Sequence, residues 1–215
     1  MEMMEKKKVK SGIYLVIDPS LDKTILLYKL QLVLEEEIAA VQVWDHFMPH
    51  QSVPDLIRKI TSLCHEKNVP VLINNQWEWL MSLPLDGVHF DNIPHDFERI
   101  QKVIDREFIA GLTCNNDLSY VHWANNYHFD YISFCSVFPS STSNSCELVK
   151  FETIQKTKEI TSMPIFLAGG IRPENIGKLK ELSFDGIAVI SGVMGSDNPD
   201  EAVREYVKQL KANKP

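Results

Sequence analysis

Short apolar runs recur along the whole chain and are separated by more polar segments. Most of the runs are continuous rather than strictly alternating, which is typical of strands that are buried on both faces of a parallel sheet. The pattern therefore predicts eight strands, at residues 13–17, 39–44, 69–74, 86–90, 108–112, 130–138, 163–168 and 185–191.

The segments between these runs carry apolar residues three and four positions apart, as one face of a helix does. In the last of them, Asn198 is a suitable N-cap and Pro199 suits the first helical position. Residues 77–83 leave room for only a turn or two. The spacing predicts helices at 26–38, 55–67, 98–108, 151–160, 174–182 and 200–212.

Eight strand–helix units in 215 residues favour a single (β/α)8 TIM barrel. The alternative is an open doubly wound sheet, but no G-x-G-x-x-G motif follows the first strand. We expect residues 1–11 to form a charged N-terminal extension and residues 12–215 to form the barrel domain. No linker or second domain is apparent.

Composition narrows the set of partners. The chain is 44% hydrophobic and 24% charged, with a net charge of −7, which argues against a nucleic-acid partner. No apolar run approaches the roughly 20 residues of a membrane span, so no membrane is expected. The first ten residues are too charged for a secretory signal, and no close C-x-x-C pair is present. We therefore expect a cytoplasmic protein that acts on a small molecule, and a homo-oligomer is compatible with the sequence.

In a (β/α)8 barrel the functional residues lie at the carboxyl ends of the strands. Polar or small residues stand at most of those ends, so we expect them to share one face of the barrel. They are Asp18, then Gln42 with Trp44, Asp45 and His46, then Asn74 and Asn75, His89 and Asp91, Thr113 and Asn115, Ser136, Gly169 and Gly170, and Ser191 and Gly192.

The last two strand ends carry the strongest local signal. The segments LAGGI and ISG place glycines where backbone N–H groups can approach a phosphate, beside the start of a helix. The glycines could instead serve only to turn the chain. Two such loops at the two expected strands favour a phosphate site. By contrast, His89 in a short strand is more typical of a packed, hydrogen-bonded structural residue than of a catalyst.

Taken in order, these motifs resemble the thiamine phosphate synthase / TenI family from about residue 12 to residue 206. The phosphate loops alone are shared by many barrels, whereas DGVHF followed by DYISFCSVFPSST is more specific. The matching segments are IYLVID, VQVWDH, VPVLINN, DGVHF, DYISFCSVFPSST, LAGGIRPENI and DGIAVISGVMGSDNPDEA.

The resemblance implies a TIM barrel of thiamine biosynthesis. Synthases of this family are transferases that join a hydroxymethylpyrimidine diphosphate to a thiazole phosphate with magnesium and release pyrophosphate. The implied catalytic residues are Gln42, His46, Thr113, Ser140 and Thr142, and the implied phosphate site is Gly169, Gly170, Ser191 and Gly192. The implied pyrimidine and diphosphate region comprises Gln42, Trp44, Asn74 and Asn75, and the candidate metal ligands are Asp91 and Asp96.

The diphosphate side departs from the family pattern. Trp44 and His46 stand where the synthases of the family carry Arg and Lys, and Asn75 stands where they carry a metal-binding Asp. Pro94 replaces a second Asp, and the loop after strand 6 lacks its Lys. A diphosphate leaving group needs carboxylates for its metal and cations for its developing charge. His46 supplies charge only when it is protonated. The resemblance therefore implies that the synthase reaction is altered or lost.

Two alternatives remain open. One is a TenI-like relative that binds or isomerises a thiazole phosphate, although Ser136 stands where those isomerases carry a His. The other is a regulatory phosphate-binding barrel. Neither alternative requires a cofactor, whereas synthase activity requires magnesium.

Overall fold

Eight parallel strands pair in chain order, and β1 also pairs with β8, so the sheet closes on itself. The computed structural model describes residues 6–139 and 147–213. Closure confirms the predicted (β/α)8 barrel and excludes the open sheet. The strands are β1 (Gly12–Ile17), β2 (Ile38–Val43), β3 (Val71–Asn74), β4 (Gly87–Phe90), β5 (Ile109–Cys114), β6 (Tyr131–Cys135), β7 (Ile165–Ala168) and β8 (Gly186–Val189).

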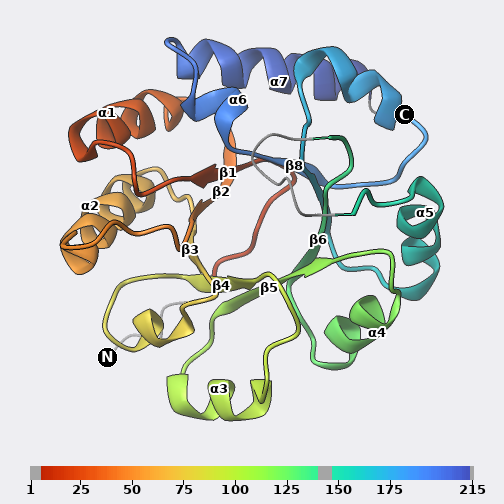
Figure 1. Ribbon diagram of the computed structural model, residues 1–215, viewed down its shortest axis with the longest axis horizontal. Helices are drawn as coiled ribbons and strands as arrows, with labels where there is room; N and C mark the ends of the chain where they lie inside the picture. Colours follow the sequence, from red (N-terminus) through yellow and green to blue (C-terminus); the bar gives the residue numbers. More distant parts are fainter. Residues whose placement is uncertain (1–5, 140–146, 214–215) are drawn as a thin grey trace.

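Helices surround the strands on the outside of the barrel (Figure 1). The predicted start of the last helix is confirmed at Pro199, whereas the predicted helix near 174–182 is a 3-10 helix. The helices are α1 (Lys23–Val33), α2 (Val53–Glu66), α3 (Phe97–Ile104), α4 (Ser119–Asn126), α5 (Phe151–Ile160), α6 (Ser191–Met194) and α7 (Pro199–Asn213). The 3-10 helices are η1 (Trp77–Met81) and η2 (Pro173–Leu179).

The first helix lies earlier in the chain than the predicted span of 26–38. The Asp22 carboxylate accepts hydrogen bonds from the N–H groups of Thr24 and Ile25, which caps the helix at Lys23. β2 begins at Ile38, so the chain must leave the helix several residues before that point. The acidic residues 35–37 consequently lie in the connection rather than at a helix end.

Successive side chains on each strand face opposite sides, and this alternation separates two cores. On β1, Ile13, Leu15 and Ile17 pack against the helices, whereas Tyr14 and Val16 face the barrel interior. The interior is apolar toward the amino ends of the strands and polar toward their carboxyl ends. The inward polar residues are Gln42, Asn74, His89, Thr113 and Ser133.

The amino ends of three even-numbered strands share one hydrogen-bonding arrangement. Asp86, Asp130 and Asp185 directly precede β4, β6 and β8, and each carboxylate accepts the N–H of a residue at the start of the preceding strand at 2.7–2.8 Å. Each aspartate N–H in turn donates to the carbonyl of that same residue at 2.8–2.9 Å. The Asp that begins each of the segments DGVHF, DYISF and DGIAV thus links its own strand to the preceding strand by hydrogen bonds.

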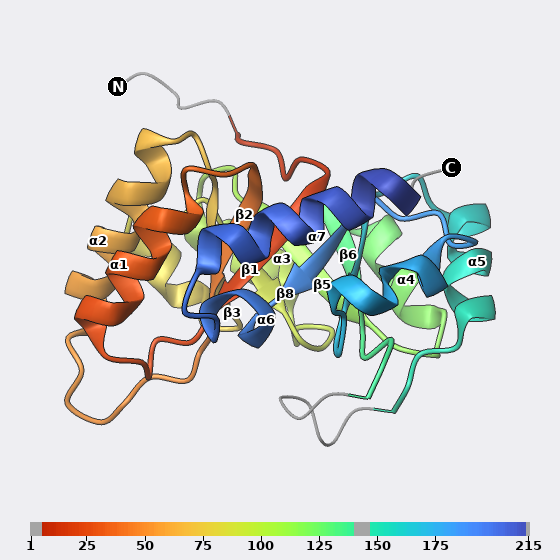
Figure 2. The same ribbon diagram turned by 90° about the horizontal axis from the view of Figure 1, so that it is seen from above.

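Residues from the predicted extension also contact this end of the barrel. Lys6 pairs with Asp130 at 2.7 Å, Lys7 pairs with Asp86 at 3.1 Å, and Val9 packs against the inner core. Figure 2 shows this red segment at the edge of the barrel opposite α6, which follows β8. The boundary at residue 11 stays a prediction. No helix among the described residues is long and apolar enough to cross a membrane.

Candidate functional site

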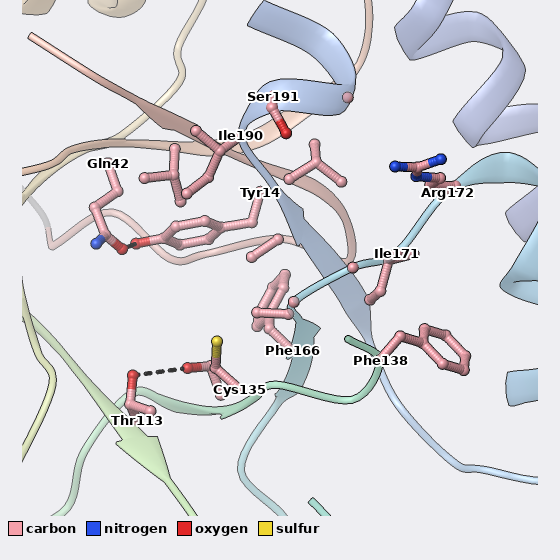
Figure 3. A pocket seen from close by; sticks show the side chains of 18 of the residues that line it. Tyr14, Gln42, Thr113, Cys135, Phe138, Phe166, Ile171, Arg172, Ile190 and Ser191 are labelled. Atoms are coloured by element: carbon pink, nitrogen blue, oxygen red, sulfur yellow. Dashed lines mark hydrogen bonds between the residues drawn. The ribbon is translucent and has the colours of Figure 1, made fainter. Parts of the chain in front are cut away.

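A cleft of about 1770 Å³ opens at the carboxyl ends of the strands. Figure 3 shows side chains from opposite sides of the barrel, among them Gln42, Thr113 and Ser191, facing this one space. The cleft brings together most of the residues singled out in the sequence. Those that line it are Gln42, Trp44, Asn74, His89, Asp91, Thr113, Asn115, Gly169, Gly170, Ser191 and Gly192.

The end of β2 distributes its residues between the cleft and solvent. Gln42 is buried, and its side-chain amide donates to Asn74 and accepts from Tyr14. Trp44 is partly exposed and lines the cleft. His46 lies outside the lining residues, with 58% of its side chain exposed, and its Nδ1 lies 3.3 Å from the Asp18 carboxylate. Its ring packs against Trp44 at a centroid distance of 5.3 Å.

Two asparagines hold the carboxylates beside β3 and β4. Asn74 donates to Asp91 at 2.8 Å, and the Asn75 amide nitrogen donates to both Asp91 and Asp45 at 2.9 Å. Asn75 has a φ of +53°, a left-handed conformation that Asn and Asp tolerate better than most residues. This rim therefore holds its carboxylates with neutral amides.

The other candidate metal ligand has a local structural role. Asp96 is the N-cap of α3, and its carboxylate accepts from the N–H of Arg99. It does not line the cleft with Asp91. Among the described residues, no group of three or more His, Cys, Asp or Glu side chains is arranged to hold a metal ion.

His89 is a buried residue at the cleft floor and is hydrogen-bonded through both ring nitrogens, as its strand position predicts. Nδ1 lies 2.8 Å from the Tyr131 hydroxyl, and Nε2 lies 2.8 Å from the Thr113 hydroxyl. Burial lowers the pKa of His89 to about 4, and the nearby Asp91 charge opposes this shift only in part. Burial also raises the pKa of Tyr14 and of Tyr131. All three groups are neutral near pH 7.

The loops after β7 and β8 need their glycines. Gly169 and Gly170 have φ values of +88° and +63°, and a Cβ at Gly169 would lie 2.3 Å from the Ser136 Oγ. Within the described residues their N–H groups donate no hydrogen bond, although both carbonyls accept one. At Gly192 a Cβ would lie 2.1 Å from the Tyr206 hydroxyl. Free backbone N–H groups beside a cleft are suited to an anion.

Among the described lining residues, Lys and Arg occur only near these loops. Arg172 and Lys178 are exposed residues of the segment after β7, and Figure 3 shows Arg172 extending toward the side of Ser191. Glu174 and Glu205 also line this part, so the positive charge is local rather than general. Within the described lining, the opposite end near Trp44 and Asp91 carries no Lys or Arg.

Sequence reasoning missed several lining residues. The signal for Tyr14, Tyr131 and Ser133 is the period of two along their strands, which places them on the same inward face as Gln42 and Thr113. Arg172 and Lys178 follow the phosphate loop, where their charge could have indicated a role. Ser140 and Thr142 lie outside the described residues.

Fold and cleft together define a (β/α)8 barrel with a cleft at the carboxyl ends of its strands, where such barrels bind their ligands. The family model described as thiamine monophosphate synthase, TMP-TENI, matches residues 13–193. The chain therefore belongs to the thiamine monophosphate synthase family, which confirms the resemblance found in the sequence.

Individual relatives agree along nearly the whole chain. A thiamine-phosphate synthase of Clostridium tetani is 28% identical over 94% of this chain and 97% of its own length. One of Clostridioides difficile is 28% identical over 97% of this chain and 100% of its own length. The solved structure of thiamine phosphate pyrophosphorylase from Pyrococcus furiosus matches with a TM-score of 0.80 at 22% identity, covering 95% and 98% of the two chains. That structural likeness supports the shared barrel fold.

Proposed function

We propose that this protein binds a thiazole phosphate, or a closely similar heterocyclic phosphate monoester, and does not carry out the diphosphate transfer of a thiamine phosphate synthase. The phosphate would lie on the loops after β7 and β8, against Gly169, Gly170, Ser191 and Gly192. The ring would extend toward Gln42 and Thr113 on the cleft floor. Function would then be binding, regulation or isomerisation within thiamine biosynthesis.

The uneven charge of the cleft carries this proposal. The β7–β8 end combines free N–H groups with Arg172 and Lys178, whose charges offset those of Glu174 and Glu205. The β2–β4 end combines Trp44, amides and the carboxylate of Asp91, with Asp45 bound to Asn75 beside it, and its described lining carries no Lys or Arg. A monoester dianion suits the first end. A diphosphate would meet like charge at the second end, and like charges repel strongly where water is partly excluded.

The residues present do not fit a magnesium ion well. A divalent cation needs several free oxygen ligands. Asn75 instead directs its amide nitrogen at the Oδ2 atoms of both Asp45 and Asp91, and Asn74 directs its own at Asp91. Hydrogen-bond donors thus engage the Oδ2 atom of each carboxylate, which leaves fewer oxygen atoms for a cation than a magnesium ion needs.

A second candidate function is thiamine phosphate synthesis itself. It is favoured by family membership and by the end-to-end match to the clostridial synthases. Gln42, Thr113 and the phosphate loops would then serve the same reaction, with His46 supplying charge when it is protonated. The two candidates differ in whether magnesium and the pyrimidine diphosphate are needed.

Calorimetry with the intact chain separates them. Thiazole phosphate should bind in EDTA as tightly as in magnesium, and no thiamine phosphate should form from both substrates with magnesium at high protein concentration. Product formation in the magnesium-containing mixture would establish the synthase instead. Absence of binding by both thiazole phosphate and thiamine phosphate would overturn the proposed function.

Matched variants test where the phosphate binds. Arg172→Ala and Lys178→Ala each remove a cation that lines the cleft, and we expect each to weaken binding about tenfold, or ~1.4 kcal/mol. Lys180→Ala removes the same charge two residues beyond Lys178, at an exposed position outside the lining. It should leave the affinity unchanged. Equal effects of Lys178→Ala and Lys180→Ala would place the phosphate elsewhere.

A further inference from the structure

One continuous chain of hydrogen bonds crosses the barrel interior from the rim near Asp91 to β6. Its side chains come from six strands or strand ends, and Tyr14, Tyr131 and Asn74 are at most 2% exposed. Figure 3 shows one step of it, where Tyr14 and Gln42 meet end to end. In order, the chain comprises Asp91, Asn74, Gln42, Tyr14, Tyr131, His89, Thr113 and Ser133.

The direction of this chain is set at the Asp91 end. An ionised carboxylate only accepts hydrogen bonds, so the group that Asn74 presents to it must be the NH₂. The carbonyl oxygen of Asn74 then faces Gln42, which must donate its own NH₂. The Gln42 oxygen is left facing the Tyr14 hydroxyl at 2.8 Å. Each amide therefore has one orientation.

Single hydroxyl hydrogens carry the direction onward. The Tyr14 hydroxyl donates its only hydrogen to Gln42. In the 2.7 Å contact between the two tyrosine hydroxyls, Tyr131 must therefore donate to the Tyr14 oxygen. The Tyr131 oxygen must in turn accept from His89, which places a hydrogen on Nδ1. The neutral ring has no second hydrogen, so Nε2 is an acceptor. Thr113 must donate to it, and the Ser133 hydroxyl, 3.3 Å away, is the remaining donor to Thr113.

We propose that this unidirectional chain holds His89 as its Nδ1–H tautomer and makes His89 a positioning residue for the Thr113 hydroxyl. His89 does not line the cleft through a free nitrogen, because both nitrogens are engaged inside the barrel. It acts instead by drawing the Thr113 hydrogen inward. Thr113 then offers the cleft only an oxygen lone pair, so the ligand atom beside it must be a hydrogen-bond donor.

The tautomer is measurable in the ligand-free protein, so this test does not depend on the proposed function. Two-dimensional ¹⁵N–¹H spectra separate protonated from unprotonated ring nitrogens in each histidine. We expect His89 to show one tautomer near pH 7, with Nδ1 protonated and Nε2 bare. Its signals are assigned by their loss in His89→Gln or, if that variant does not fold, by correlation to the His89 backbone. A protonated Nε2 in the wild-type protein would overturn the proposal.

Variants test the anchor. Asp91→Asn replaces an obligate acceptor with an amide that can donate or accept. The hydrogen bonds between Asp91 and Ser133 can then point in either direction. The two ring nitrogens should then move toward an averaged, mixed-tautomer position. Asp45→Asn removes the same charge from a carboxylate that also accepts from Asn75 but lies outside the chain. It should leave the His89 spectrum unchanged. No change in Asp91→Asn, or the same change in both variants, would refute the anchoring role of Asp91.

A second pair of variants tests the link to Thr113. Thr113→Val removes the donor to Nε2 while nearly conserving shape, and the Nε2 signal should shift toward that of a free acceptor. Thr113→Ser keeps the hydroxyl and should restore the wild-type shift. If Val and Ser give the same spectrum as the wild type, Thr113 does not donate to His89 and the positioning role fails.

Discussion

The two ends of the barrel both carry carboxylates, but they hold them in different ways. At the amino ends of the strands, Asp86, Asp130 and Asp185 accept backbone N–H groups, and each also pairs with a lysine at 2.7–3.3 Å. At the carboxyl ends, Asp45 and Asp91 accept from the side-chain amides of Asn74 and Asn75. At the amino ends, lysines neutralise the charge of the carboxylates, whereas at the carboxyl ends the amides leave that charge in place.

This difference separates stability from function within one fold. Carboxylates that accept buried backbone N–H groups and pair with cations define which strand lies beside which. Carboxylates held only by amides are positioned without being neutralised, so they keep their electrostatic effect on whatever enters the cleft. The division agrees with the general behaviour of (β/α)8 barrels, whose functional groups gather at the carboxyl ends of the strands.

Removal of one carboxylate from each end gives the sharpest test of the comparison. Asp86→Ala should lower the free energy of unfolding by about 2–4 kcal/mol, because it leaves the Val71 N–H and His65 without their partner. Asp45→Ala, at the other end, should change it by only about 0.5 kcal/mol. Urea unfolding followed by circular dichroism measures both. Equal losses would show that the carboxyl-end carboxylates are structural as well.

The charge missing from the carboxyl end can be supplied. The triple variant Trp44→Arg, His46→Lys and Asn75→Asp adds two cations and a carboxylate at the rim, and Asp tolerates the left-handed backbone at position 75. It should bind inorganic pyrophosphate with magnesium at least about tenfold more tightly than the wild type, or ~1.4 kcal/mol, as measured by calorimetry.

A control triple variant isolates the effect of place from that of net charge. Tyr28→Arg, Val103→Lys and Asn68→Asp make the same charge changes at sites away from the cleft lining, and Asn68 also has a positive φ, of 55°. This control should bind pyrophosphate no better than the wild type. If the rim variant gains nothing over the control, the assignment of the diphosphate region to this rim is wrong.

Acid should destabilise the fold in part through Asp86 at the amino end of the barrel. Burial alone raises the pKa of Asp86, but the hydrogen bonds from His65 and Val71 and the charges of His65 and Lys7 outweigh it and hold that pKa below its usual value of 3.8. A carboxyl group with a depressed folded-state pKa stabilises the fold above its unfolded pKa, and this stabilisation is lost as the pH falls through the folded pKa.

The matching measurement is the urea midpoint between about pH 5 and pH 2. In the wild type, the midpoint should fall as the pH drops below about 4. Asp86→Asn, which keeps an oxygen for the Val71 N–H but has no charge to lose, should show a shallower decline over the same range. Parallel declines in the two proteins would mean that the Asp86 charge does not contribute.

The barrel could be predicted from the sequence because its strands are continuous apolar runs that recur with helical segments between them. Element ends were less predictable. The first helix begins earlier than predicted because the capping carboxylate of Asp22 lies three residues before the first strongly apolar position. The helix expected after Pro173 is a 3-10 helix, a difference in hydrogen bonding that apolar spacing does not reveal.

The cleft could be predicted only in outline. Strand ends identified Gln42, Asn74, Thr113 and the glycine loops, because period-two alternation and the barrel rule place them together. The sequence cannot show that Asn75 bridges two carboxylates, since that contact joins residues 30 and 16 positions apart. Nor could it show that His46 turns toward Asp18 rather than into the cleft, because side-chain direction beyond a strand end follows the loop.

The smallest expected effect concerns the lysines of the amino end. Lys7 pairs with Asp86, and their side chains are 25% and 10% exposed, whereas Lys67 pairs with Glu35 at 44% and 67% exposure. Solvent screens the second pair more fully. Lys7→Ala should therefore lower the free energy of unfolding by about 0.5–1 kcal/mol, and Lys67→Ala by roughly 0.2 kcal/mol or less. Urea unfolding in low and high salt measures both, and only the Lys7 loss should persist in 1 M NaCl, a concentration at which the screening length is about 3 Å. If the Lys7 effect disappears in high salt, the lysine acts only as a screened surface charge. Asp86 would then be held by His65 and the backbone alone. The amino end, like the rim of the cleft, would in that case leave its carboxylates without a neutralising cation.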